Sequence, residues 1–178
     1  METGRLLITE LTMDMAMDIH LNSLDSDTRR FVPDEVFETP ADARKALAYL
    51  IRQYGSVSGP LVYALITKDG GRNIGYVQLV PMDDGKWEIG FHVAEPYTGQ
   101  GFATEAVSAW LPVIAERVGA AEVYGIRLPE NAASGRVLEK CGFREFFRGR
   151  GRFHGSESEI AQSIWQADDH NRVCKAPT

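Results

Sequence analysis

The sequence predicts an α/β fold: a mixed, mostly antiparallel sheet with one parallel strand–helix–strand step, flanked by helices on both faces. Residues 87–93 alternate apolar with other side chains, as in a strand with one buried face, and residues 103–118 repeat apolar positions at helical spacing. Residues 122–128 read as a second strand, so parallel pairing through a right-handed crossover is expected. Segments 61–68 and 73–80 surround a Lys-Asp-Gly-Gly turn, which is typical of an antiparallel hairpin.

The segments before this hairpin predict one strand and two helices. In chain order they are a short strand at 5–11, a helix that begins near Thr12 or Asp14 and reaches Leu21, a polar loop at 22–30, an ambiguous stretch at 33–37, and a helix from Thr39 to Tyr54. The last helix has the clearest start, because Thr39 suits the N-cap, Pro40 the first helical position and Asp42 the first turn. The stretch 55–60, rich in glycine and serine, is expected to end it.

The segments after the central helix complete the sheet. In chain order they are the strand at 122–128, a helix at 132–141, and strands at 144–150 and 157–166. Gly142 follows the helix at the place where a left-handed residue commonly ends one. The chain is therefore expected to form one domain over residues 1–166, with a polar tail at 167–178 that frays.

Composition argues against several classes of protein. The chain has 178 residues, 44% of them hydrophobic, which suffices for one sizeable core. No apolar run reaches the ~18 residues of a membrane span, and the N-terminus lacks the build of a signal peptide. Two cysteines suit a reducing cytoplasm, and the four histidines lack zinc-ligand spacing, so no metal is expected. A net charge of −6 without a visible basic stripe argues against nucleic acid and is compatible with a cationic substrate.

A glycine-rich loop joins the strand at 87–93 to the central helix. It reads Thr-Gly-Gln-Gly-Phe-Ala-Thr-Glu-Ala from Thr98 to Ala106. Gly99 and Gly101 let the backbone turn tightly and approach a ligand closely. Because the N–H groups in the first turn of a helix are unpaired, this loop predicts an anion site, and a pyrophosphate is the expected ligand.

The loop resembles the acetyl-CoA pyrophosphate loop of the GNAT N-acetyltransferase superfamily, which reads Arg/Gln-x-x-Gly-x-Gly/Ala. Thr98 falls at the first position, Gly101 at the fourth and Ala103 at the sixth. Thr98 departs from the usual Arg or Gln, as is usual in the ribosomal-protein N-terminal acetyltransferase branch (RimJ/RimL-like), which the form Pro-Tyr-x-Gly-x-Gly-x-Ala-Thr-Glu-Ala resembles. The resemblance covers Arg5 to Gln166, and it implies a GNAT-like sheet whose two parallel strands splay apart around the pantetheine arm.

The resemblance implies acetyl-CoA as co-substrate. The expected cofactor contacts come from the end of the strand at 87–93, the loop, and the helix at 132–141. They are Phe91, His92, Val93, Thr98, Gly99, Gln100, Gly101, Phe102, Ala103, Thr104, Asn131, Ser134 and Arg136.

A second motif, Asn-Ala-Ala-Ser-Gly-Arg-Val-Leu-Glu-Lys-Cys-Gly-Phe, spans residues 131–143. By itself it reads as an amphipathic helix with Asn131 as N-cap. In the family, Asn131 matches an asparagine that bonds the pantetheine or nearby backbone, and Ser134 matches a serine near the cofactor sulfur. Arg136 could reach the 3′-phosphate, although an exposed helix arginine is the simpler interpretation. Leu138 stands where many members have a catalytic tyrosine, so Ser134 is expected to hydrogen-bond the departing thiolate or to order a water.

The implied reaction is attack of a neutral amine on a thioester. Glu88 and His92 share the strand face opposite the apolar one, so they are the candidate bases, with a solvated Glu88 that has no catalytic role as the alternative. Glu88 is favoured, acting through a water, because it lies further back along the strand, where the pantetheine arm would deliver its sulfur. At pH 7 an α-amine is about 10% neutral and a lysine less than about 0.1%, which favours a peptide or protein N-terminus as acceptor.

Other functions are weighed against this one. A dinucleotide oxidoreductase is disfavoured because Thr104 replaces the third glycine of the Gly-x-Gly-x-x-Gly fingerprint, and because Glu122 begins its strand instead of ending it. An acetyltransferase for a small-molecule amine (a polyamine, an antibiotic or an amino acid) stays open. So do a non-catalytic acyl-CoA-binding module and a homodimer.

Overall fold

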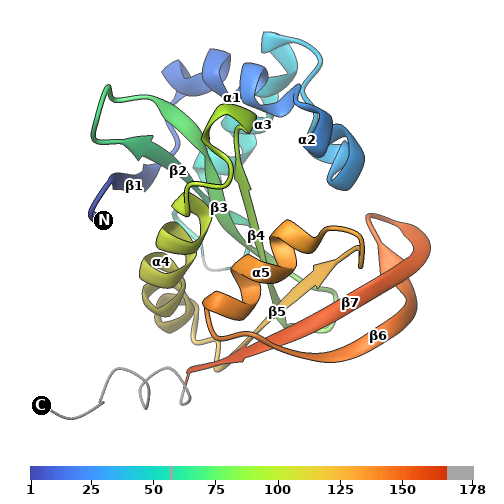
Figure 1. The fold of residues 1–178 in the computed structure, drawn as a ribbon. Coiled ribbons are helices and arrows are strands. Elements are labelled where there is room, and N and C mark those ends of the chain that lie inside the picture. The colour runs from blue at the N-terminus through green and yellow to red at the C-terminus, as the bar shows by residue number, and fades with distance from the viewer. Residues whose placement is uncertain (57, 168–178) are drawn as a thin grey trace, which may run out of the picture.

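The computed structural model describes residues 1–56 and 58–167 (Figure 1). With η for a 3₁₀ helix, its elements in chain order are β1 (Leu6–Glu10), η1 (Met13–Met15), α1 (Ala16–Ser23), α2 (Ser26–Phe31), η2 (Pro33–Glu35), α3 (Pro40–Gln53), β2 (Leu61–Thr67), β3 (Asn73–Pro81), β4 (Trp87–Val93), η3 (Glu95–Tyr97), α4 (Phe102–Val118), β5 (Glu122–Arg127), α5 (Ala132–Lys140), β6 (Arg144–Phe153) and β7 (Ser156–Gln166). Apart from Ala167, the tail expected to fray lies outside the described residues.

All seven strands form one sheet in the order β1-β2-β3-β4-β5-β7-β6. Every neighbouring pair is antiparallel except β4 and β5, which run parallel. The β4–β5 ladder pairs Glu88 with Tyr124 and extends no further among the described residues. The predicted mixed sheet with one parallel step is therefore confirmed, and Figure 1 shows the two parallel strands diverging toward their carboxyl ends.

Helices cover both faces of the sheet. Alternate residues of β2 separate these faces, because successive side chains of a strand point to opposite sides. Leu61 and Leu65 belong to the core that includes the buried face of α4, whereas Val62 and Ala64 pack with Leu47 of α3. Each large side chain buried in this way contributes roughly 1.5–3 kcal/mol, so both helix layers are held firmly against the sheet.

The segment before η2 departs from the sequence prediction. Residues 22–30, predicted to be a loop, contain the end of α1 and most of α2. Asp25 caps α2 by accepting a 2.7 Å hydrogen bond from the backbone N–H of Thr28. The helix has only six residues and no apolar repeat, so a search for periodicity does not find it. The loop prediction is wrong here, and it matters because α2 forms one wall of the cavity described below.

Other boundaries agree closely with the pattern. Thr39 forms the predicted cap as a full capping box with Asp42, and Gly142 adopts a left-handed φ of 88° after α5. The strand predicted at 144–150 is longer than expected and continues as β6 to Phe153. Among the described residues, no helix combines the length and the apolar character that crossing a bilayer requires.

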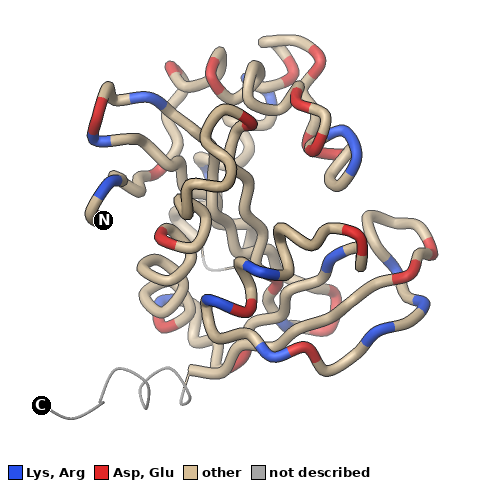
Figure 2. The backbone as a smooth tube through the Cα atoms, in the orientation of Figure 1, with Lys and Arg blue, Asp and Glu red and all other residues tan. Residues whose placement is uncertain are grey.

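The edge strand β6 carries a local concentration of positive charge that the sequence analysis did not identify. Its four arginines are visible in Figure 2 and are Arg144, Arg148, Arg150 and Arg152. Arg150 and Arg152 stand opposite Glu159 and Glu157 of β7, and Arg148 forms a 3.0 Å ion pair with Glu145. The charge of these three arginines is thus largely balanced, and charged side chains on an edge strand discourage pairing with other chains.

Candidate functional site

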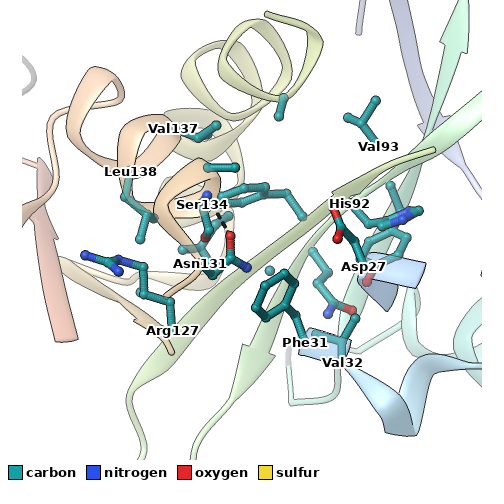
Figure 3. Close-up of a pocket in the computed structure, with 18 of the residues that line it drawn as sticks. Asp27, Phe31, Val32, His92, Val93, Arg127, Asn131, Ser134, Val137 and Leu138 are labelled. Atoms are coloured by element: carbon teal, nitrogen blue, oxygen red, sulfur yellow. Dashed lines mark hydrogen bonds between the residues drawn. The ribbon is translucent and has the colours of Figure 1, made fainter. Parts of the chain in front are cut away.

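A cavity of about 790 Å³ opens where β4 and β5 separate (Figure 3). Its lining comes from segments far apart in the sequence: α2 and η2, the middle of β3, the length of β4, the start of α4, the junction of β5 and α5, and the β6–β7 turn. In Figure 3, Asn131 and Ser134 lie on one side of this cavity, and Asp27 and His92 on the other. The splayed strands therefore bring both sequence motifs to one place.

The glycine-rich loop gives the cavity a helix N-terminus. Gly99 and Gly101 have φ angles of 73° and 82°, which are costly for a residue with a Cβ. Gly101 is the N-cap residue of α4, and no described side chain caps the helix there. The backbone N–H groups of its first turn, where Phe102 and Ala103 line the cavity, are consequently available to an anion.

Arg5 braces this loop from outside the cavity, a role that the sequence analysis missed. Its guanidinium donates a 3.0 Å hydrogen bond to the carbonyl of Gln100 and forms a 2.7 Å ion pair with Glu105. It also lies 4.2 Å from the centre of the Phe102 ring. Arg5 thereby neutralises the carboxylate in the first turn of α4, which would otherwise repel an anion at the same helix end.

The start of α5 supplies the second wall. The side-chain oxygen of Asn131 accepts a 3.0 Å hydrogen bond from the backbone N–H of Ser134, so Asn131 is the predicted N-cap (Figure 3). The cap uses only the oxygen and leaves the amide group of Asn131 able to donate. Leu138 is 2% exposed and packs against Gly125 of β5. A Cβ added to Gly125 would lie only 2.8 Å from a methyl carbon of Leu138. The position that would carry a tyrosine acid is thus closely packed against β5.

Glu88 lies on the cavity floor with its carboxylate in an unusual environment. It is half-buried, and among the described residues no side chain donates a hydrogen bond to it. Burial raises the pKa of Glu88 from 4.5 to about 7, with His154 acting against the rise and the carboxylates of Glu35 and Asp34 adding to it. A carboxylate with such a pKa can take up and release a proton at neutral pH.

Glu35 is a second carboxylate beside the same floor, and no motif indicated it. Its oxygen accepts a 2.8 Å hydrogen bond from the side-chain amide of Gln78, and burial raises its pKa. Gln78 stands opposite Gly90 in the β3–β4 ladder, and a Cβ on Gly90 would come within 2.6 Å of its amide nitrogen. Gly90 therefore leaves the room in which Gln78 reaches across the strand to Glu35.

His92, the other candidate base, is engaged in a hydrogen-bond cluster. Its Nε2 lies 2.9 Å from the carboxylate of Asp25 and 2.9 Å from the hydroxyl of Thr28. Its ring stacks on Tyr76 with 5.8 Å between centroids. These contacts join β4 to the start of α2, so a structural role accounts for the position of His92, and its role as a base stays a prediction.

Asp25→Asn is expected to lower the stability of the fold at pH 7. Burial alone would raise the pKa of Asp25, but hydrogen bonds from His92 and from the backbone and hydroxyl of Thr28 lower it from 3.8 to about 2. An acid whose pKa is depressed by folding stabilises the fold above its unfolded pKa, here by roughly 2 kcal/mol, and this contribution is lost as the pH falls from about 4 to 2.

Denaturant unfolding of both proteins at pH 7 and at successively lower pH measures this effect. The exposed Asp18→Asn on α1 serves as the matched control. The difference between wild type and Asp25→Asn should shrink as the pH falls toward 2. Equal stability of the two proteins at pH 7 would contradict this account of α2.

The β6–β7 turn closes the cavity at the side of η2. His154 there has a positive φ of 46° and lines the cavity. Its Nδ1 lies 2.7 and 2.9 Å from the two carboxylate oxygens of Asp34. The two residues are 120 positions apart in the chain, and in the sequence His154 is only one of four scattered histidines.

The structure brings nearly all predicted site residues together. Those that line the cavity are Glu88, Phe91, His92, Val93, Thr98, Gly99, Gly101, Phe102, Ala103, Thr104, Asn131, Ser134 and Arg136. Gln100 is the exception, because its side chain donates a 3.1 Å hydrogen bond to the carbonyl of Pro96 and does not line the cavity. Their catalytic and binding roles stay predictions. Within the described part of the chain, no group of three or more His, Cys, Asp or Glu residues is placed to hold a metal ion.

Comparison with known proteins adds three findings. Residues 5–144 match the family model described as "Acetyltransferase (GNAT) domain". An uncharacterised N-acetyltransferase of Bacillus subtilis (strain 168), YnaD, is 28% identical over 149 residues, covering 82% of this chain and 84% of the relative. A GNAT-family acetyltransferase from Bacillus anthracis has a similar structure, with a TM-score of 0.79 at 22% identity over 94% of this chain and 98% of the other.

A further solved structure is similar in fold. It is RimL, a ribosomal L7/L12 α-N-protein acetyltransferase in complex with coenzyme A, with a TM-score of 0.79 at 15% identity. The match covers 93% of this chain and 96% of the other. At such identity the likeness extends to the fold alone.

Proposed function

Because this chain belongs to the family of GNAT acetyltransferases, we propose that it transfers the acetyl group of acetyl-CoA to the free α-amine of a peptide or protein. The family membership rests on a match over residues 5–144, most of the chain. The amine acceptor is the part that is proposed. The observation that carries it is the environment of Glu88, a half-buried carboxylate with a pKa of about 7.

The residues around the cavity fit acetyl-CoA on two counts. The cavity of about 790 Å³ runs from a helix N-terminus with uncapped N–H groups to the floor that holds Glu88. The loop at 98–104 would hold the pyrophosphate, and Asn131, Ser134 and Arg136 would contact the rest of the cofactor. When bound, acetyl-CoA supplies an activated acetyl thioester, and the protein supplies positioning and proton transfer.

The proton-transfer groups favour an acceptor that is already partly neutral. Glu88 with a pKa of about 7 is a mild base, and Leu138 provides no acid. An α-amine, which is about 10% neutral at pH 7, needs little help, whereas a lysine, less than about 0.1% neutral, needs a stronger base. Ser134 lies on the cavity wall, where its hydroxyl could hydrogen-bond a thiolate.

The acceptor is tested by comparing kcat/KM for two versions of one short peptide. The first has a free N-terminus and no lysine; the second is blocked at its N-terminus and carries one lysine. The free N-terminus should react more than about 100-fold faster at pH 7, which is the ratio of the two neutral fractions. A reaction without enzyme gives the background. Equal rates for the two peptides would overturn the N-terminal assignment and leave the acetyltransferase activity in place.

A small cationic amine is the second candidate acceptor. Four carboxylates line the cavity, from Asp27, Asp34, Glu35 and Glu88. The lining also has four basic side chains, three of which (Arg127, Arg136 and Lys140) belong to β5 and α5. The carboxylates belong to α2, η2 and β4, so a positively charged acceptor is favoured on that side, and a polyamine carries more charge than a single N-terminus. Spermidine and an aminoglycoside therefore belong in the same assay, and turnover of these alone would favour the second candidate. Binding of acetyl-CoA without turnover of any amine would support a non-catalytic binding module.

A further inference from the structure

The proposed reaction releases a proton that has to leave the cavity. A protonated primary amine carries three protons on nitrogen, and the amide product keeps one of them, so two protons are lost in the reaction. In balance, R–NH₃⁺ and acetyl-CoA give the amide, CoA–SH and one H⁺. The thiolate takes one proton, so the other must pass to solvent. Glu88 is half-buried, and no hydrogen bond joins it to another described side chain. A proton on Glu88 therefore has no direct side-chain path to solvent.

His154 stands between this cavity and solvent. Its side chain is 26% exposed, yet the residue lines the cavity together with Glu88. Imidazole is the side chain best suited to pass protons near neutral pH, because it accepts at one nitrogen and donates from the other. His154 is thus in a suitable place to exchange protons with both the interior and the bulk.

The orientation of His154 is imposed by its neighbours. Asp34 engages Nδ1 at 2.7 Å, and the Phe153 ring stands at 88° to the imidazole with 4.3 Å between centroids. When Nδ1–H donates to the carboxylate, Nε2 is the nitrogen that can accept a proton. This orientation is kept despite a φ of 46°, at a turn position where glycine or asparagine is more usual.

The charged groups that face His154 come from three elements. Asp34 and Glu35 belong to η2, Glu88 to β4, and Arg152 to β6, the strand that leads into the turn. Three carboxylates and one guanidinium therefore line the cavity together with His154, which gives the surroundings of this side chain an acidic character.

We propose that His154, oriented by Asp34, relays to solvent the proton that Glu88 takes from the acceptor amine. In the first step an amine N–H bond breaks and the proton passes, through water, to the Glu88 carboxylate. In the second, the Glu88 O–H bond breaks and a proton passes, through water, to Nε2 of His154, where an N–H bond forms. In the third, that N–H bond breaks and the proton enters bulk water, which restores both side chains. His154 is accordingly a relay residue that acts through Glu88, and the inference rests on the proposed function.

The test combines His154→Asn with Glu88→Gln and measures kcat in weakly buffered solution. Asparagine tolerates the left-handed turn but cannot carry the proton. His154→Asn should lower kcat roughly tenfold, less than the roughly 10²–10⁴ typical of direct proton transfer. Added imidazole buffer should restore the lost rate in this variant and leave the wild type unchanged. The double variant should be no slower than Glu88→Gln, because the relay has no proton to pass in that background.

Matched variants separate a relay from a structural effect. His20→Asn, at a histidine outside the cavity whose ring contacts the carbonyl of Phe37, is the control and should keep wild-type kcat. Melting temperature and acetyl-CoA affinity establish that His154→Asn is folded. If His154→Asn is not folded, Asp34→Asn takes its place, because this variant keeps the imidazole but removes the group that orients it. Its kcat is measured in weakly buffered solution with and without added imidazole. The loss of kcat should be smaller, and imidazole should restore it.

Each result decides for or against the relay. An unchanged kcat for His154→Asn, the lack of any effect of imidazole, or losses that multiply in the double variant would overturn it. If Glu88→Gln is slow while His154→Asn is normal, only the relay fails and the proposed function stands. If Glu88→Gln itself turns over normally, the proposed base fails, and the relay fails with it.

Discussion

A Gly101→Glu variant is expected to lose measurable affinity for acetyl-CoA. Gly101 is the N-cap residue of α4 and has a φ of 82°, so any side chain there strains the turn. A Cβ would meet only the Arg5 guanidinium, at 3.7 Å, so the site is not sterically closed. The added carboxylate would instead place a negative charge at the helix end where the pyrophosphate is expected, and Arg5 would pair with it.

Isothermal calorimetry and the shift in melting temperature on adding acetyl-CoA measure this loss, since a ligand of the folded state raises its stability. Gly119→Glu is the matched control. Gly119 also has a positive φ, 68°, with open space around it, but it lies at the opposite end of α4. It should keep wild-type affinity. Similar binding by wild type and Gly101→Glu would show that the loop is misassigned, and preferential binding of NADH would favour an oxidoreductase.

A Glu88→Gln variant is expected to lower kcat at pH 7 by roughly 10²–10⁴, the usual contribution of a positioned general base. The affinity for acetyl-CoA should change little, because glutamine keeps the shape of the side chain. Activity should recover in part at high pH, where the amine loses its proton without help. Glu116→Gln, at an exposed position of α4 outside the cavity, is the control.

The pH dependence gives an independent measure of the same residue. Burial raises the pKa of Glu88 to about 7, so its basic form predominates only above that pH. The kcat/KM of the wild type should therefore rise with pH through about 7, and Glu88→Gln should lack this inflection. If both proteins give the same pH–rate profile, the base is His92 or no side chain at all.

Local patterns predicted the fold and one half of the site. The capping box at Thr39, the alternation along β4 and the glycines before α4 each depend on neighbours within a few positions. Such features can be recognised from spacing alone. The side of the cavity where we propose that the cofactor binds is built from two segments of this kind, 98–104 and 131–138, and most of its lining residues were expected from the sequence.

The opposite side of the cavity, where we propose that the acceptor binds, could not be predicted because it is built from contacts between distant segments. Glu35 lines the cavity and is held there by a hydrogen bond from Gln78, 43 positions away, and His154 meets Asp34 across 120 positions. Neither pairing leaves a repeat or a motif in the sequence. His92 illustrates the same limit: its face on β4 was predicted, but its partner Asp25 lies in a segment that was expected to be a loop.

The single residue pair between β4 and β5 has a consequence for aggregation. Beyond Glu88 and Tyr124 no ladder joins the two strands among the described residues, so the sheet has two open edges in its middle as well as those of β1 and β6. Open strand edges invite pairing with other chains unless something covers them. β6 is protected by its charges, whereas the inner edges depend on what fills the cavity. Acetyl-CoA bound as we propose would cover these inner edges, so we expect the protein to aggregate less during storage when the cofactor is present.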